Sequence, residues 1–255
     1  VLWSMSMYMD FSTSYDYETG FVPSKNMSTD NFIRSLVALW EEPATYVRQF
    51  AQAVGSVSEG YFLSWFVEKC LPGEWVSLNN DLLFNEAGIT AKQWRNIRNS
   101  LLQKGILLNR RTVAPTESQF TLNDALFEDL VSKHGKSDVL DMVSPPISIN
   151  KLHLKTLADR GLAFVSILYL SFLQSEAEYQ DLSKRGDWSP WTHAAEKHVF
   201  YSTMLSRRQQ ERAIAELTSF GLIESCVDGM PAARRCRYSL KMLADLTSEY
   251  LNGCV

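Results

Sequence analysis

The fold is decided by residues 205–224, which read LSRRQQERAIAELTSFGLIE. Ser206 is a strong helix N-cap, because its side-chain oxygen can accept a hydrogen bond from a backbone N–H of the first turn. Apolar residues follow at helical spacing, and Gly221 offers the left-handed conformation that commonly ends a helix. The stretch therefore predicts a capped helix over 207–220. The apolar residues after the glycine predict a strand that enters a β-hairpin, with an Asp-Gly turn at 228–229.

The same landmarks occur earlier in the chain, in residues 88–107, which read GITAKQWRNIRNSLLQKGIL. Thr90 corresponds to the cap Ser206 and Gly105 to the stop Gly221, and both offsets are 116 residues (206 − 90 and 221 − 105). Other residues match at this offset: Trp75 with Trp191, Phe84 with Phe200, Leu101 with Leu217, and Ile106-Leu107 with Leu222-Ile223. Matches in order and without a gap predict a repeated structural module.

Both copies resemble the winged helix-turn-helix family, in which a capped recognition helix ends at a Leu-x-x-x-Gly-Leu-Ile pattern and leads into a hairpin called the wing. The resemblance covers about residues 60–134 and 160–250. It implies a mainly α fold with small β-hairpin wings (α+β), built as two winged-helix domains in tandem. We expect an irregular N-terminal arm over 1–28, a helical extension plus the first winged-helix domain over 29–134, a linker over 135–150, and the second winged-helix domain over 151–255.

The resemblance also implies which residues meet DNA, because a recognition helix enters the major groove while the wing lies near the backbone or the minor groove. Arg can pair with guanine in the major groove, and Gln or Asn can pair with adenine. The predicted helix contacts are Lys92, Gln93, Arg95, Asn96 and Arg98 in the first copy, and Arg207, Arg208, Gln209 and Arg212 in the second. The predicted wing contacts are Arg110, Arg111, Arg234, Arg235 and Arg237. The simpler alternative is that these residues form ordinary solvated faces.

The two copies differ in how well their surface chemistry suits DNA. Arg207 and Arg208 follow the second cap directly, and we expect the second copy to carry most of the DNA affinity. Trp94 lies in the first recognition helix, where it could belong to the core or face a partner. The first copy could therefore have exchanged part of its base contacts for a protein contact.

Composition places limits on the class of protein. The chain has 255 residues, of which 45% are hydrophobic, and a net charge of −4. This composition is typical of a globular protein, and the acidic balance counts against one that coats nucleic acid without sequence preference. A local basic face remains compatible with it, because distant charges are screened. No stretch is apolar enough for a membrane span and no signal peptide is recognised, so we expect a cytoplasmic protein without membrane contact.

Catalytic and metal-binding signatures do not emerge from the sequence. No phosphate-binding glycine motif, HExxH or GxSxG occurs, and His193 and His198 are five residues apart rather than four. We therefore predict no enzymatic activity, no cofactor and no metal. Cys226 and Cys236 flank the predicted hairpin turn, so a disulfide between them is one reading, and free thiols in a reducing cytosol are the other.

Two winged helices in a chain of this length are similar in architecture to plasmid or phage replication initiators, and a transcription regulator with tandem winged helices fits as well. The predicted function is sequence-specific binding of double-stranded DNA in one of these two roles. The alternative is a winged-helix protein-interaction scaffold without base readout, which the acidic charge and Trp94 favour. Residues 1–54 have no counterpart in the second copy, and they could mediate a homodimer or recruit a protein partner.

Overall fold

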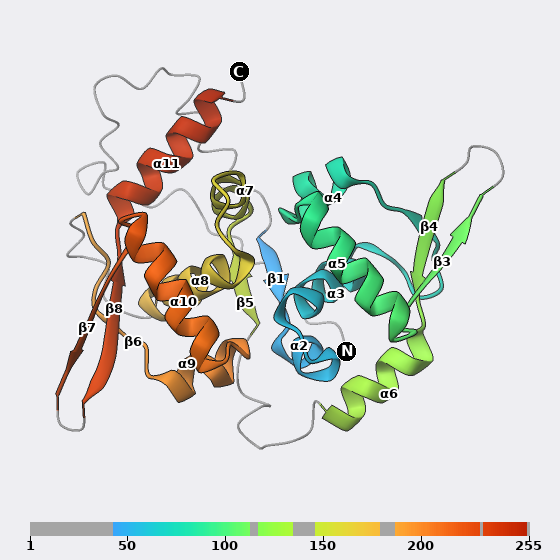
Figure 1. Cartoon of the computed structure of the whole chain (residues 1–255), viewed down its shortest axis with the longest axis horizontal. Coiled ribbons are helices and arrows are strands. Elements are labelled where there is room, and N and C mark those ends of the chain that lie inside the picture. Colours follow the sequence, from blue (N-terminus) through green and yellow to red (C-terminus); the bar gives the residue numbers. More distant parts are fainter. Residues whose placement is uncertain (1–42, 113–116, 135–145, 179–186, 230–231, 254–255) are drawn as a thin grey trace, which may run out of the picture.

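A computed structural model describes residues 43–112, 117–134, 146–178, 187–229 and 232–253 (Figure 1). These residues form ten helices and eight short strands, so the prediction of a mainly helical fold with small β-sheets is confirmed. The expected arm over 1–28 and the greater part of the expected linker lie outside the described residues. None of the described helices combines the length and the apolar character that crossing a membrane requires.

The chain consists of two units with the same order of elements. Unit one, residues 44–134, contains β1 (Ala44–Tyr46), α2 (Arg48–Val54), α3 (Val57–Lys69), β2 (Val76–Ser77), α4 (Asn80–Ala87), α5 (Ala91–Gln103), β3 (Leu107–Arg111), β4 (Ser118–Leu122) and α6 (Asp124–His134). Unit two, residues 147–253, contains β5 (Ile147–Ile149), α7 (Lys151–Asp159), α8 (Phe164–Glu178), β6 (Thr192–His193), α9 (Glu196–Thr203), α10 (Arg207–Ser219), β7 (Ile223–Asp228), β8 (Ala233–Tyr238) and α11 (Leu240–Gly253).

The two three-stranded sheets repeat in detail. Both are antiparallel, with the strand order β2-β4-β3 in unit one and β6-β8-β7 in unit two. The helices α4, α5 and α6 begin at residues 80, 91 and 124, and their counterparts begin at 196, 207 and 240, which is 116 residues later in each case. The hairpins keep the same offset in their register, since Leu107 pairs with Leu122 and Ile223 pairs with Tyr238.

The repeat extends further toward the N-terminus than the sequence indicated. The strand β1 and the helix α2 correspond to β5 and α7, at an offset of 103 residues (147 − 44 and 151 − 48). Residues 44–54 therefore have a counterpart, contrary to the expectation, and β5 occupies part of the segment expected to be linker. The offset rises from 103 residues at these elements to 107 between the starts of α3 and α8, and to 116 between those of β2 and β6. A comparison at constant spacing cannot detect such a match.

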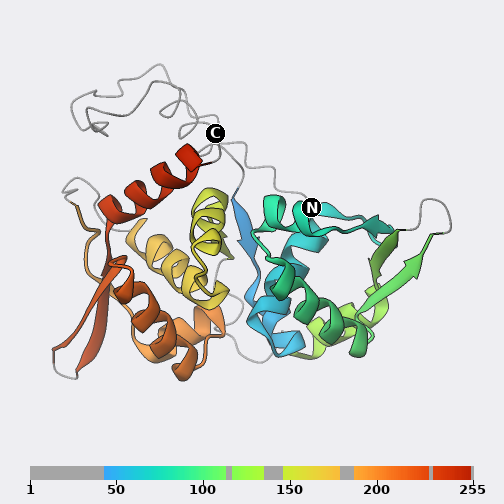
Figure 2. The same cartoon turned by 45° about the horizontal axis from the view of Figure 1, so that its top comes forward.

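The units meet along the antiparallel pair formed by β1 and β5, which we call the seam. Its register joins Ala44 to Ile149, Thr45 to Ser148 and Tyr46 to Ile147. Because the strands also correspond in the repeat, this register is symmetric about the central pair and places a pseudo-twofold axis there. Figure 1 shows the consequence: α5 and α10 lie in front of α3 and α8, and the hairpins β3–β4 and β7–β8 project at opposite ends, as Figure 2 also shows.

Aromatic side chains of α3 and β4 anchor the helix α5 of unit one. Trp94 of α5 is only 4% exposed, and its ring lies 5.1 Å from that of Phe62 and 5.4 Å from that of Phe120. Truncation of a buried tryptophan to alanine lowers the free energy of unfolding by on the order of 3–5 kcal/mol in other protein cores. Trp94 is therefore a core residue, and the reading in which it faces a partner is wrong.

Candidate nucleic-acid interface

The helices α5 and α10 begin with the same hydrogen-bonded cap. Oγ1 of Thr90 accepts from the backbone N–H of Gln93 at 3.4 Å, and Oε1 of Gln93 accepts from the backbone N–H of Thr90 at 2.8 Å. In unit two, Ser206 and Gln209 make the same reciprocal pair, at 3.4 Å and 2.9 Å. This capping box fixes where each helix starts. Each glutamine, expected from the sequence to contact a base, therefore uses its acceptor oxygen in the fold.

A left-handed turn precedes each cap. Gly88 has φ of +60° after α4, and Met204, at the equivalent position after α9, has φ of +61°. Such a turn redirects the chain between two helices, and glycine adopts it without the steric cost that methionine incurs. In unit two the side chain of Gln210 supports the turn, because its Nε2 donates to the carbonyl oxygens of Leu205 and Glu196 at 2.8 and 3.0 Å.

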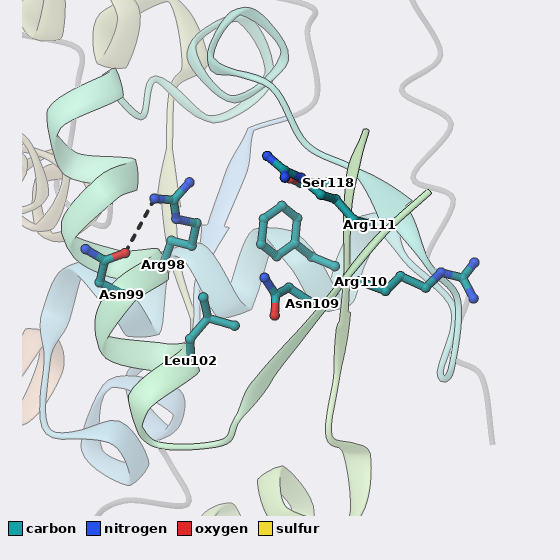
Figure 3. Close-up of a pocket in the computed structure, with 8 residues that line it drawn as sticks. Arg98, Asn99, Leu102, Asn109, Arg110, Arg111 and Ser118 are labelled. Carbon is teal, nitrogen blue, oxygen red and sulfur yellow. Dashed lines mark hydrogen bonds between the residues drawn. The ribbon is translucent and has the colours of Figure 1, made fainter. Parts of the chain in front are cut away.

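Unit one presents a cationic face on α5. Lys92, Arg95 and Asn96 are exposed there, and α5 contains no acidic residue. None of these three side chains makes an ion pair with another described residue. An open groove of about 510 Å³ runs between α5 and the hairpin, lined by Arg98, Asn99, Leu102, Asn109, Arg110, Arg111, Ser118 and Phe120. Figure 3 shows Arg98 on α5 and Arg111 on β3 flanking it, so two guanidinium groups border a space that an anion could occupy.

Arg110 lies beside the groove but extends away from it (Figure 3). Its guanidinium carbon is 4.4 Å from the centre of the Trp75 ring, and its Nε donates to Oε1 of Gln119 at 2.9 Å. Neighbouring residues of a strand point to opposite faces of the sheet, which explains why Arg110 and Arg111 diverge. Neither contact neutralises the charge of Arg110, because the ring and the amide are both uncharged.

Acidic residues neutralise several cations of unit two. Nε of Arg207 lies 3.0 Å from Oε1 of Glu211 and 3.6 Å from Oε2 of Glu196, and the hydrogen bond to Glu211 raises the Arg207 pKa above its usual value. In the hairpin, Nε of Arg235 lies 3.2 Å from Oδ1 of Asp228. The predicted contacts Arg208 and Arg212 are exposed and make no ion pair within the described part of the chain.

Arg237 is held in place on the outer face of the second sheet. Its Nε and Nη2 donate to Oε2 of Glu224 at 2.9 and 2.6 Å. Its guanidinium carbon also lies 5.0 Å from the Trp188 ring centre and 4.8 Å from that of Trp191. A guanidinium in contact with two aromatic rings and a carboxylate stabilises the sheet, while the contact of Arg237 with DNA stays a prediction.

Two arginines that line the groove of unit one correspond to apolar residues in unit two. At the offset of 116 residues, Ile214 replaces Arg98 and Val227 replaces Arg111. Val227 is 63% exposed, and its partner across the hairpin, Arg234, is half-buried. The two units therefore share the same arrangement of helices and strands but differ in the charge of the equivalent surface.

The hairpin of unit two holds no disulfide. Cys226 and Cys236 are free thiols, and the register pairs Cys226 with Arg235 and Cys236 with Ser225. Residues that neighbour each other along a strand point to opposite faces, so the two sulfur atoms lie on different sides of the sheet. The reading of a hairpin disulfide is wrong. Within the described residues, no group of three or more His, Cys, Asp or Glu side chains could hold a metal ion.

The sequence matches no protein-family model, and comparisons with curated proteins and with solved structures return no match either. The function of the chain must therefore be inferred from the geometry and charge of its own two units.

Proposed function

We propose that this chain binds double-stranded DNA sequence-specifically through two winged-helix units, with α5 and α10 as the recognition helices. The order of elements in each unit supports this assignment: helix, strand, helix, turn, helix and hairpin, with the first strand added to the edge of the hairpin. In a winged helix this arrangement exposes the third helix and the hairpin on one side, where they can meet a major groove and the adjacent backbone. Binding a defined DNA site is the step that replication initiation and transcription regulation share.

The observation that carries the proposal is the cationic face of unit one. Lys92, Arg95, Arg98 and Arg111 gather on α5 and β3, and no acidic side chain of the described residues pairs with any of them. The whole chain is acidic, with a net charge of −4, so this cluster is a local concentration of positive charge against the overall balance. Phosphate contacts supply much of the affinity of DNA-binding proteins, and such a face suits them.

The ion pairs favour a different division of affinity from the one expected from sequence. The expectation gave unit two most of the affinity, on the strength of Arg207, Arg208 and its wing arginines. Three of those cations, Arg207, Arg235 and Arg237, have carboxylate partners, while the groove cations of unit one have none. We therefore infer that unit one supplies the larger electrostatic part of binding and that Arg208 and Arg212 are the contacts of unit two.

The pseudo-twofold axis supports a single chain engaging two stretches of the same duplex. A symmetric dimer of helix-turn-helix proteins places its recognition helices in major grooves about one helical turn apart, 10–10.5 base pairs. Here one chain presents α5 and α10 on one face, related by the axis at the seam (Figure 1). A monomer thus has the arrangement for which many regulators need two copies.

Selection from a random pool of double-stranded DNA, run at two salt concentrations, tests the proposal. We expect enrichment of one site with two conserved blocks about one helical turn apart, and weaker recovery at the higher salt. A pool that shows no enrichment at either concentration contradicts DNA readout. That outcome favours the protein-interaction scaffold.

A protein-interaction role is a second candidate for unit two alone, because Val227 is largely exposed and Ile214 stands where unit one has Arg98. The double variant Arg208→Ala with Arg212→Ala separates the two roles. Under DNA binding, loss of these two exposed cations weakens the complex several-fold. Under the second candidate, its affinity for DNA equals that of the unaltered protein.

A further inference from the structure

Two buried tyrosine hydroxyl groups bind equivalent points of the two units. Ala87 ends α4 and Thr203 ends α9, and each precedes the left-handed turn that leads to a recognition helix. The carbonyl oxygen of Ala87 accepts a hydrogen bond from Oη of Tyr61 at 2.9 Å. The carbonyl oxygen of Thr203 accepts one from Oη of Tyr46 at 2.7 Å. Ala87 and Thr203 are 116 residues apart (203 − 87), so both hydroxyls bind the same position of the repeat.

Both tyrosines belong to unit one, and both connect it to unit two. Tyr46 lies in β1, at the seam, and its hydroxyl reaches across to α9. Tyr61 lies in α3, where its ring stacks on that of Phe164 in α8, with centres 4.4 Å apart and planes 23° from parallel. The counterparts in unit two, Ile149 and Leu168, carry no hydroxyl group. A tyrosine of unit one therefore binds the residue before each turn: Tyr46 reaches Thr203 from the seam, and Tyr61 reaches Ala87 from α3.

Little freedom remains around these contacts. Tyr46 and Tyr61 are at most 1% exposed, and burial raises the pKa of both phenols above the usual value, so both remain hydrogen-bond donors at neutral pH. The turn at Gly88 is packed against α7 of unit two, because a Cβ added there would lie 2.5 Å from Cγ of Leu154. The turn at Gly88 is thus enclosed between the two units, and the residue before the turn at Met204 is bound from the seam.

We propose that Tyr46 and Tyr61 are positioning residues that fix the separation of α5 and α10, so that the protein selects DNA sites by the spacing of their two half-sites. This inference rests on the proposed function. One added base pair moves a half-site by about 3.4 Å along the duplex and rotates it by roughly a tenth of a turn. If the two units are held rigidly, α5 and α10 cannot shift to match the moved half-site. The protein then binds one half-site at a time.

Replacement of Tyr46 by Phe tests the inference with a single oxygen removed. Affinity is measured for the selected DNA site and for the same site with one base pair inserted between its halves. The unaltered protein is expected to lose roughly 100-fold on the insertion, since simultaneous engagement fails. In Tyr46→Phe, and in Tyr61→Phe as a second variant, the loss is expected to be at least about fivefold smaller, because the recognition helices can adjust.

Tyr169→Phe is the matched control. Tyr169 is also fully buried, but its hydroxyl lies 3.5 Å from Sγ of Cys236 inside unit two and does not reach the seam. This variant should discriminate against the inserted site as strongly as the unaltered protein does. The ratio of the affinities for the selected and the inserted site does not depend on the fraction of active protein. Circular dichroism verifies the fold of each variant before the comparison.

A second measurement needs no DNA. A ketone-bearing amino acid is introduced at positions 103 and 219, which are equivalent exposed positions on α5 and α10, and carries a spin label in each case. Labelling through the ketone leaves the native cysteines unmodified, and the distance between the two labels is measured in the doubly labelled protein. We expect a broader distance distribution in Tyr46→Phe than in Tyr169→Phe. The same width together with the same spacing ratio in both variants overturns the inference. A protein that binds no DNA refutes the proposed function instead, while the spin labels still report on the seam.

Discussion

Removal of the two groove arginines, Arg98→Ala together with Arg111→Ala, provides the sharpest test of the cationic face. Each cation that neutralises a DNA phosphate adds about 0.9 to the slope of the logarithm of affinity against the logarithm of salt concentration. If both guanidinium groups contact phosphates, the double variant loses about 1.8 from that slope. At a salt concentration of 0.15 M this loss corresponds to roughly 30-fold weaker binding, or about 2 kcal/mol.

The assay is a salt titration of affinity by fluorescence anisotropy, with the selected DNA site and an unrelated duplex. Because phosphate contacts carry no base information, the double variant should weaken binding to both duplexes by the same factor. The control for net charge is Lys133→Ala with Lys241→Ala, which removes two exposed lysines from α6 and α11, the first of them paired with Asp129. This control should change the slope by well under one unit, because those charges lie outside the groove.

Two results would refute the reasoning. An unchanged slope in the groove variant means that Arg98 and Arg111 meet no phosphate. A slope that falls equally in the control variant means that net charge, and not the local face, determines binding. A smaller effect on the unrelated duplex than on the selected site would reassign the two arginines to base contact.

Three further predictions concern stability. Gly88→Ala should lower the free energy of unfolding by roughly 2–4 kcal/mol in urea titrations, because of the positive φ and the contact with Leu154; a loss under 1 kcal/mol contradicts the close approach. Thr90→Ala and Ser206→Ala should each cost about 1 kcal/mol by the same method, and an unchanged midpoint in either would argue against the capping box. Burial lowers the pKa of His153 to about 4, so the folded state binds fewer protons than the unfolded state between pH 4 and 6.5. Stability should therefore fall by roughly 2–4 kcal/mol as pH drops through that window, and His153→Gln should abolish most of this dependence.

Local chemistry made one part of the fold predictable. Helix ends depend on interactions between residues only a few positions apart, such as the caps Thr90 and Ser206 and the glycines that end the helices. The helices α5 and α10 begin where these caps indicate. The seam was not predictable, because β1 and β5 have three residues each and pair across a separation of about a hundred positions. A three-residue strand has too few residues to show an alternating pattern. Its stability comes from tertiary contacts such as that between Tyr46 and Thr203.

The sequence predicted which residues of the candidate site are exposed, but not all of the ion pairs that neutralise some of them. Lys92, Arg95, Arg208 and Arg212 are exposed on the two helices, as the expected recognition faces require. The pairing of Arg207 with Glu211 was visible in the sequence, since residues four apart on a helix are neighbours. The Ser/Thr-x-x-Gln signature of the capping box was visible as well. The pairing of Arg237 with Glu224 depends on the register of the hairpin, which the sequence leaves open.

The difference between the two units therefore lies in their surfaces and not in their frame. Exposed ion pairs contribute at most about 1 kcal/mol to stability, so the pairs of Arg207 and Arg235 are not what holds unit two together. Their physical effect is to lower the positive potential of one face, while Arg98 and Arg111 leave the equivalent face of unit one positive. If the chain binds DNA as proposed, unequal faces give its two orientations different affinities wherever the two half-sites differ in sequence. Under the proposed function, the asymmetry in charge therefore orients the protein on a site with unequal halves, with unit one on the half-site that binds more tightly.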